Sequence, residues 1–285
     1  MKPSWLPVLL GCAIGLSVAH PIPAQVPAQD NPVLLDTPYA PAGYARLLQK
    51  YVVKLDSTQG GFESRFDYIR FWETTDQDRI RDDIRSRFLS VDPDALDPST
   101  LSAWAVNAYN FLIIDLVMEN LVAGGELKSI ADIGKGEFSV FDQERFEIAG
   151  KSYSLNRFEH HFLFGDVDRE SGRIPRDLDP RFHFALVCAA KGCPPLWPEP
   201  LDPQILDRQL AAMTRNALRS PRQLRALGNT IHVSQIFAWY EVDFQRVGMR
   251  AFLETYAPED VAAMLAGASK KVVADIEWDW SLNRP

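Results

Sequence analysis

Cys188 and Cys193 stand in the segment HFALVCAAKGCPPL, where an apolar run passes into a glycine-containing turn and a double proline. The thiolate of either cysteine could attack a carbonyl carbon, with His160 as the base that removes the thiol proton. Glu159, Asp279 or Asn107 could orient the imidazole, as in other arrangements of nucleophile, base and orienting group. These residue types predict a cysteine- and histidine-dependent hydrolase or acyl transferase, although their spacing matches no thiol-enzyme signature.

The same side chains allow a metal site in place of a nucleophile. Zn²⁺ is bound by thiolate and imidazole groups, and the short interval between the two cysteines lets both thiolates reach one ion. Such a site could use Cys188, Cys193, His160 and either His161 or His183. Oxidation of the thiols would compete with metal loading in an exported protein.

A disulfide between the two cysteines is the third alternative, and it is the one we favour. A turn through the intervening residues can bring the Cα atoms within the roughly 4.4–6.8 Å that a disulfide requires. So short a loop gains on the order of 2 kcal/mol or less in chain entropy, so the bond would mainly hold local shape. The protein would then be a non-catalytic binding or scaffolding domain, and a reactive thiol would distinguish the alternatives.

Asn107 and Asn110 lie in the apolar segment LSAWAVNAYNFLIIDLVMENL. This segment predicts a helix over 97–121, because Asp97 can cap it and Pro98 suits its first position. The helix is apolar nearly all round, which predicts a buried central element. The two asparagines share one face of it. Buried amides need partners, so they either fix neighbouring backbone or act directly in catalysis.

Two further elements would position the candidate residues. A short helix is predicted over Asn156–Phe164, with its first residue as N-cap and Glu159 as the capping-box partner, an alternative to a catalytic role. Phe184–Val187 is predicted to form a strand buried on both faces. Strand alternation places His183 and Cys188 on opposite faces, which makes this histidine a poor partner for the cysteine. The predicted site comprises Cys193, Cys188, His160, Glu159, Asn107 and Asn110.

The remaining pattern predicts peripheral helices and hairpins. Apolar spacing and capping signals indicate helices over 44–52, 75–89, 202–218, 236–244, 250–256 and 259–266. Strands are expected over 138–141 and 272–276, and hairpins pair 145–148 with 152–155 and 223–227 with 230–234. No repeat or linker divides residues 43–285. We therefore predict a single α+β domain with the buried helix packed on a small mixed sheet.

The N-terminal residues predict an export signal. One lysine precedes a mostly apolar stretch, and small residues allow cleavage after Ala19 or Ala24, which gives a signal peptide over 1–24. That stretch is shorter than the about 20 residues of a membrane span, and no integral membrane segment is expected in the mature chain. A lipoprotein anchored at Cys12 is the alternative. Residues 25–42 are predicted to form a flexible leader, and the protein to be periplasmic or secreted.

The composition limits the class of partner. The formal net charge is −8, whereas non-specific nucleic-acid binding needs a basic surface, so a nucleic-acid partner is not expected. A hydrophobic content of 46% with seven Trp indicates a folded core. Trp239 and Tyr240 would fill that core or, if exposed together, could stack on a sugar ring. The partner is therefore an unknown ligand or envelope protein, and the sequence indicates neither a cofactor nor an oligomeric state.

Five short segments occur in a characteristic order. They are AWAVNAYNFLI, the pair Glu159-His160 after Leu-Asn, HFALVCAAKGCPPL, IFAWYEVDF and the closing DWSLN. Together they resemble the domain-of-unknown-function 547 family over roughly residues 85–283. The resemblance implies a family often found in exported bacterial proteins and without an established activity, so it supports the choice of residues and not a reaction. Phe164 stands where the family is expected to carry a basic residue, which puts anion binding in doubt.

Overall fold

The computed structural model describes residues 36–56, 60–122, 126–134, 136, 138–165, 179–267 and 270–285. These residues belong to one contact unit, Leu34–Pro285. The predicted signal peptide 1–24 and most of the predicted leader 25–42 lie outside the described residues. The end of the leader segment contacts the domain, because Asp36 accepts a hydrogen bond from the Ala42 amide at 3.0 Å and pairs with Arg87 at 2.7 Å.

The central element is the helix α4, Pro98–Val122. The Asp97 carboxylate accepts hydrogen bonds from the amides of Ser99 and Thr100 and so caps the first turn, as the sequence predicts. Side chains are buried on nearly every side of the helix, and Trp104 is completely buried. The predicted buried central helix is confirmed, and with it the α+β class.

By length and composition alone, α4 could cross a membrane. From the sequence, no integral membrane segment was expected in the mature chain. However, 89% of its most apolar stretch is buried inside the domain. Packing against the neighbouring elements therefore accounts for its apolar surface.

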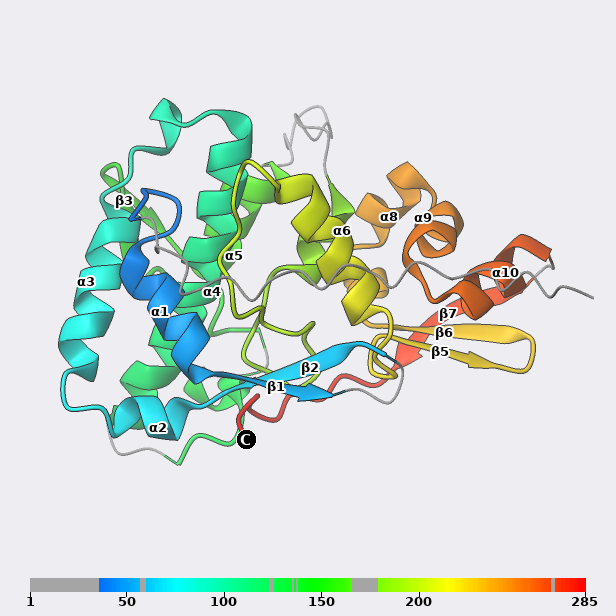
Figure 1. Ribbon diagram of the computed structural model, residues 1–285, viewed down its shortest axis with the longest axis horizontal. Coiled ribbons are helices and arrows are strands. Elements are labelled where there is room, and N and C mark those ends of the chain that lie inside the picture. Colours follow the sequence, from blue (N-terminus) through cyan, green and yellow to red (C-terminus); the bar gives the residue numbers. More distant parts are fainter. Residues whose placement is uncertain are drawn as a thin grey trace, which may run out of the picture. The chain divides into compact units, whose positions relative to one another are not determined.

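Other helices, and not the mixed sheet, surround α4 (Figure 1). The first of them are α1, Ala42–Tyr51, α2, Tyr68–Trp72, and α3, Gln77–Leu89. α2 and α3 contact α4 directly and α1 packs on both of them, while α5, Leu155–Glu159, contacts α4 independently. Two short 3-10 helices, η1, Pro93–Ala95, and η2, Ile130–Ile133, lie before and after α4 in the chain.

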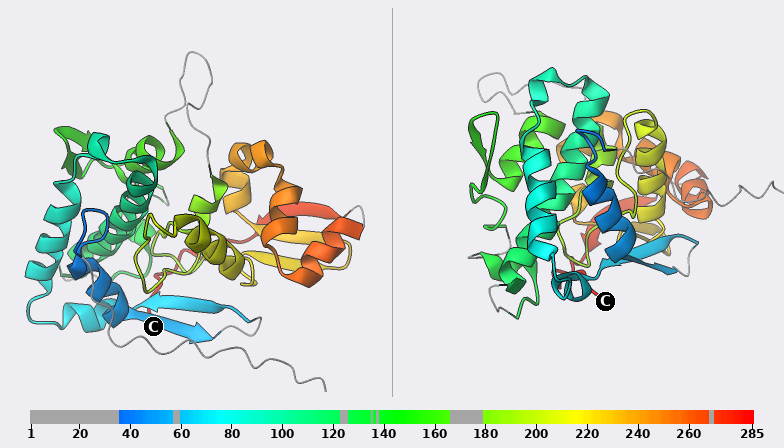
Figure 2. Two further views of the ribbon diagram at one scale, coloured as in Figure 1. Left: turned by 45° about the horizontal axis from the view of Figure 1, so that its top comes forward. Right: turned by 60° about the vertical axis from the view of Figure 1, so that its left-hand side comes forward.

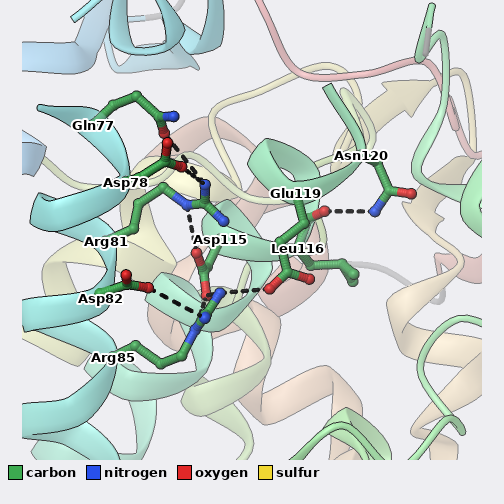
Figure 3. Close-up of polar contacts among 9 residues, drawn as sticks. All are labelled: Gln77, Asp78, Arg81, Asp82, Arg85, Asp115, Leu116, Glu119 and Asn120. Carbon is green, nitrogen blue, oxygen red and sulfur yellow. Dashed lines mark hydrogen bonds and ion pairs between the residues drawn. The ribbon is translucent and has the colours of Figure 1, made fainter. Parts of the chain in front are cut away.

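Ion pairs fix α3 to α4 (Figure 3). The Asp115 carboxylate is buried on α4 and accepts hydrogen bonds from Arg81 Nε at 2.7 Å and from Arg85 Nε at 2.5 Å. Arg85 also pairs with Glu119, one turn further along α4. Because two guanidinium groups compensate the buried carboxylate, it does not carry the cost of an unpaired charge. The network is a structural connection between the two helices.

Two hairpins flank this helical part. β1, Val52–Asp56, pairs antiparallel with β2, Phe62–Phe66, and β3, Phe146–Ile148, pairs antiparallel with β4, Lys151–Tyr153. The second hairpin is the one predicted for 145–148 and 152–155, and its turn residues Ala149 and Gly150 both have positive φ. The first was not predicted, because its strands are partly exposed and carry no continuous apolar pattern.

The third sheet is mixed. β6, Thr230–Ser234, pairs antiparallel with β5, Leu224–Leu227, and parallel with β7, Lys271–Ile276. This arrangement confirms the predicted hairpin over 223–227 and 230–234 and the predicted strand over 272–276. In Figures 1 and 2 the sheet lies at the opposite end of the domain from α3.

The helices near the mixed sheet build a second core. They are α7, Ile236–Trp239, α8, Glu241–Val247, α9, Met249–Tyr256, and α10, Glu259–Gly267. α6, Leu206–Ala217, contributes Leu210 and Met213 to the core around α4 and Ala217 to the second core. Phe184, Phe237 and Phe244 are buried in this core, which is separate from the core around α4. The predicted helix 236–244 is divided at Tyr240 into α7 and α8.

Two predicted strands are wrong. Residues 138–141 form a turn. Phe184 is the last residue of a 3-10 helix, η4, Pro180–Phe184, and the residues that follow it up to Val187 join no sheet. The side chain of Asn110 replaces the missing strand partner, because its Nδ2 donates to the Ala185 carbonyl at 2.9 Å and its Oδ1 accepts from the Val187 amide at 3.0 Å. The backbone groups of a buried apolar run can therefore be satisfied by a side chain, without a neighbouring strand.

Candidate functional site

A pocket with a cavity volume of about 90 Å³, partly open to solvent, is formed by residues that are distant in the sequence. α4, α5 and α7 contribute side chains, together with the cysteine loop and the last segment of the chain. Three of the predicted site residues, Glu159, Cys188 and Cys193, line it. This volume is below the about 300–1,000 Å³ of sites that enclose drug-sized ligands, so the pocket suits a small organic group.

Glu159 is the last residue of α5, where the helix changes type. The hydroxyl of Ser154 caps α5 by accepting a backbone hydrogen bond at 3.1 Å. The predicted N-cap at Asn156 is therefore wrong, and the capping box that would have engaged Glu159 does not form. The chain continues as one π-helical turn, η3, His160–Phe164. Such turns are rare and occur frequently at functional sites.

The carboxyl group of Glu159 is an isolated acid at the wall of the pocket. The residue is 5% exposed, Tyr240 Oη donates to its Oε1 at 3.1 Å, and Tyr109 makes a second hydrogen bond to it. Burial raises the pKa of Glu159 to about 7, the nearby Asp243 acts in the same direction, and the two tyrosines oppose it. No Lys or Arg occurs among the described residues that line the pocket. The acid therefore has no cationic partner there, and its protonation changes near neutral pH.

His183 joins the same group of buried polar residues. Its ring lies between Phe164 and Tyr240, with centroid distances of 4.3 and 3.8 Å. Its Nε2 donates to Asp243 Oδ2 at 2.9 Å, since a carboxylate only accepts. Burial lowers the pKa of His183, so the imidazole is neutral at pH 7. Phe164, where the resemblance leads one to expect a basic residue, is thus a packing surface for this histidine.

A disulfide closes the cysteine loop. The Sγ atoms of Cys188 and Cys193 lie 2.09 Å apart, which confirms the pairing that we favoured from the sequence. The final segment of the chain holds the loop in place, because two loop amides donate to the carbonyl groups of Ser281 and Asp279 at 2.8 and 2.9 Å. One wall of the pocket is therefore fixed covalently and by backbone hydrogen bonds.

Gly192 is required where the loop meets the final segment. A Cβ atom at this position would lie 2.7 Å from the ring of Trp278, closer than real Cβ contacts allow. The Gly192 carbonyl also accepts a hydrogen bond from Gln223 Nε2 at 2.7 Å. The close approach of backbone and ring fixes where Trp278 lies in the pocket wall.

Four aromatic side chains form the remainder of the wall: Phe138, Trp239, Trp278 and Trp280. The ring centroids of Trp239 and Trp278 are 4.8 Å apart, and Phe138 lies 5.5 Å from Trp239 and 5.3 Å from Trp280. Trp239 is 41% exposed, whereas Tyr240 is half-buried with its hydroxyl on Glu159. Exposed aromatic rings that line a concave surface are typical of ligand sites.

Residues 93–217 match the model of a family described as Protein of unknown function, DUF547. The match supports the DUF547 family. The DUF547 segment contains α4, α5, the cysteine loop and α6, and so it includes Glu159 and both cysteines. Tyr240 and the three pocket tryptophans lie beyond it. No curated protein and no solved structure matches the chain.

The two asparagines of the DUF547 segment connect backbone segments. Asn107 Nδ2 donates to the carbonyl groups of Tyr39 and Leu201 at 2.8 and 3.0 Å, and its Oδ1 accepts from the Leu201 amide at 2.8 Å. Asn110 bonds the backbone of Ala185 and Val187, just before Cys188, as described above. Neither lines the pocket, so the structure places both where the backbone-fixing alternative expects them.

His160 is exposed and does not line the pocket. The centroid of its ring lies 6.4 Å from that of Phe164. The structure therefore does not bring His160 together with the two cysteines. Within the described parts of the chain, no group of three or more His, Cys, Asp and Glu side chains is arranged to hold a metal ion. Both sulfurs that the metal alternative requires are joined to each other.

Sequence reasoning missed the buried partners of Glu159. Tyr109, Tyr240, His183 and Asp243 reach the acid or its neighbours from three different places in the chain. One signal was available, because Tyr240 and Asp243 are three residues apart in an aromatic segment, a spacing that places side chains close together on a helical turn. The contacts with the earlier residues depend on the tertiary fold.

Proposed function

We propose that the domain binds a small organic molecule in this pocket, without covalent chemistry at the cysteines. The observation that carries the proposal is the convergence of an aromatic wall on one buried acid, Glu159, that has no basic partner among the described lining residues. Pockets that bind small molecules are typically apolar with few polar groups, and strongly shifted acids concentrate at functional sites. The proposal corresponds to the binding alternative with a structural disulfide.

A cysteine- and histidine-dependent hydrolase or acyl transferase has less support. A thiolate nucleophile needs a free sulfur and a base within hydrogen-bond reach. The sulfurs of Cys188 and Cys193 are bonded to each other, and His160 is exposed outside the pocket lining. His183 lines the pocket, but its Nε2 is engaged by Asp243.

We also propose that the mature protein works in the cell envelope, as a periplasmic or secreted domain. The basis is the signal-like sequence over 1–24 together with the paired cysteines. Disulfides persist mainly in oxidising compartments outside the cytosol. The mass of protein isolated from a periplasmic fraction tests this proposal, because cleavage after Ala19 or Ala24 gives a defined loss, and an uncleaved chain in the cytosol would contradict it.

Binding is tested with protein that carries 5-fluorotryptophan. A set of neutral, cationic and anionic small molecules is screened by ¹⁹F NMR, with assignments from single Trp replacements. A pocket ligand should shift the resonances of Trp239, Trp278 and Trp280 and leave that of Trp72, which is exposed on α2, unchanged. Trp239→Ala should weaken binding about tenfold or more, equivalent to about 1.4 kcal/mol, and Trp72→Ala less than about twofold. The absence of any such ligand would contradict the proposal.

A further inference from the structure

We infer that the pocket selects an organic cation, an amine or quaternary ammonium group, for which Glu159 is the counter-ion. This inference rests on the proposed binding function and names the class of ligand. Three features carry it: the charge of the lining residues, the aromatic wall, and the spare hydrogen-bonding capacity of the acid.

The charges that face the pocket are acidic. Among the described lining residues the ionisable side chains are Glu159, the neutral His183 and the two protonated tyrosines, Tyr109 and Tyr240. Asp243, which is hydrogen-bonded to His183, lies near enough for its charge to raise the pKa of Glu159 further. An anionic ligand would meet this acid without a Lys or Arg to compensate it, whereas a cation would supply the missing partner.

The wall offers π faces to such a cation. Trp239, Trp278, Trp280 and Phe138 lie with neighbouring ring centroids between 4.8 and 6.1 Å apart. A cation within about 6 Å of a ring centroid is attracted by the ring's quadrupole, most strongly by Trp, and aromatic sites of this kind bind quaternary ammonium groups. A neutral sugar could also stack on these rings, but it would leave the buried acid uncompensated.

Glu159 keeps acceptor capacity for a ligand. A carboxylate has about four lone-pair positions, and the hydrogen bonds from Tyr240 and Tyr109 use two of them. Burial raises the pKa of both tyrosines, so they remain donors and hold the carboxyl in place. The arrangement therefore positions the acid without neutralising it.

Cation binding should be linked to the protonation of Glu159. A bound cation favours the carboxylate, so affinity should be greatest above pH 7 and should fall as the acid becomes protonated below pH 7. The other groups that face Glu159 are Tyr109, Tyr240, Asp243 and His183, and burial lowers the pKa of His183 below its ordinary value. Binding near pH 6.5 should release a proton to the buffer.

The experiment compares choline with its neutral isostere 3,3-dimethylbutan-1-ol, in which carbon replaces nitrogen. Affinities are measured on the full mature protein by tryptophan fluorescence and by calorimetry at pH 8 and pH 5.5, in two buffers of different ionisation enthalpy. Choline should bind at least tenfold more tightly than the alcohol at pH 8, and the ratio should shrink at pH 5.5. Trp239→Ala should weaken binding of both probes, because it removes part of the aromatic wall.

Glu159→Gln is the decisive variant, because it retains a hydrogen-bond acceptor for the tyrosines and removes the charge. It should weaken choline binding at pH 8 about tenfold or more and change binding of the alcohol less than about twofold. Glu147→Gln, at an exposed acid on β3, is the matched control and should leave both affinities unchanged. Far-UV circular dichroism and the unfolding temperature verify that both variants are folded.

The outcomes separate this inference from the proposed function. Equal affinity for the two probes, or equal loss of both in Glu159→Gln, overturns the cation assignment and leaves the binding function. Failure of both probes, while the ¹⁹F screen finds another pocket ligand, also overturns only the assignment. If no molecule in the screen shifts the pocket tryptophans, both the assignment and the binding function are overturned.

Discussion

Replacement of Glu159 by Gln should remove a pH-dependent penalty from the stability of the unliganded domain. The carboxyl has an ordinary pKa of 4.5 in the unfolded chain and about 7 in the folded domain, because the fold buries it. The folded state therefore binds this proton more tightly than the unfolded state does. Its contribution to stability becomes less favourable as the pH rises from about 4.5 to 7 and is constant above that range. At about 1.36 kcal/mol per pH unit, the full penalty is about 3 kcal/mol.

The assay is urea unfolding of the wild-type protein and Glu159→Gln at pH 5, 6, 7 and 8. His183 acts with the opposite sign, because its lowered pKa stabilises the folded state above pH 6.5 and this stabilisation is lost as the pH falls through 6.5. Both proteins contain His183, so the difference between them at each pH isolates the acid. Glu147→Gln, exposed on β3, is the control for loss of a charge alone.

The free energy of unfolding of Glu159→Gln, relative to that of the wild type, should rise by about 2–3 kcal/mol between pH 5 and pH 8. For Glu147→Gln, the difference in the free energy of unfolding from the wild type should change by less than about 0.5 kcal/mol over the same range, as expected for an exposed acid. A difference between Glu159→Gln and the wild type that stays constant from pH 5 to 8 would refute the reasoning. It would mean that Glu159 titrates in the folded domain as it does in the unfolded chain.

Three other predictions concern the frame of the pocket. Alkylation should label neither Cys188 nor Cys193 until reductant is added, and mass spectrometry of the peptides should then show both labelled; labelling without reductant would contradict the disulfide. Asn110→Ala should lower the free energy of unfolding in urea by about 2–4 kcal/mol, because two buried backbone groups lose their partner, and a loss below about 0.5 kcal/mol would contradict that role. Gly192→Ala should move the ¹⁹F resonance of Trp278, and an unchanged resonance would refute the close packing.

The sequence was sufficient where the signal is local. The segment that became α4 combines a capping Asp97, apolar residues on every side and two amides on one face, and each of these features has the structural consequence predicted from it. The hairpin around Ala149 and Gly150 is equally local, since both turn residues adopt positive φ. The short spacing of Cys188 and Cys193 was enough to favour their pairing.

The sequence was insufficient where the deciding partner is distant in the chain. The run Phe184–Val187 looks like a strand, but its backbone is bound by Asn110, which lies 75 residues before Ala185. The hydrogen bond between Glu159 and Tyr240 spans 81 residues, and that between His183 and Asp243 spans 60. No local pattern distinguishes an acid that caps its own helix from one that is held by a tyrosine 81 residues further along the chain. The chemistry of the site is therefore a tertiary property.

The pocket also depends on both sides of the DUF547 boundary at residue 217. The DUF547 segment supplies Glu159 and the disulfide loop, and Asn110 on α4 fixes the backbone that leads into that loop. The hydroxyl that holds the acid comes from Tyr240, and the segment that bonds the loop, which includes Trp278, is at the end of the chain. A fragment that ends at residue 217 would keep the acid and the cysteines but would lose the tyrosine and the tryptophan wall. Selection of a ligand by Glu159 is thus expected only from the complete domain.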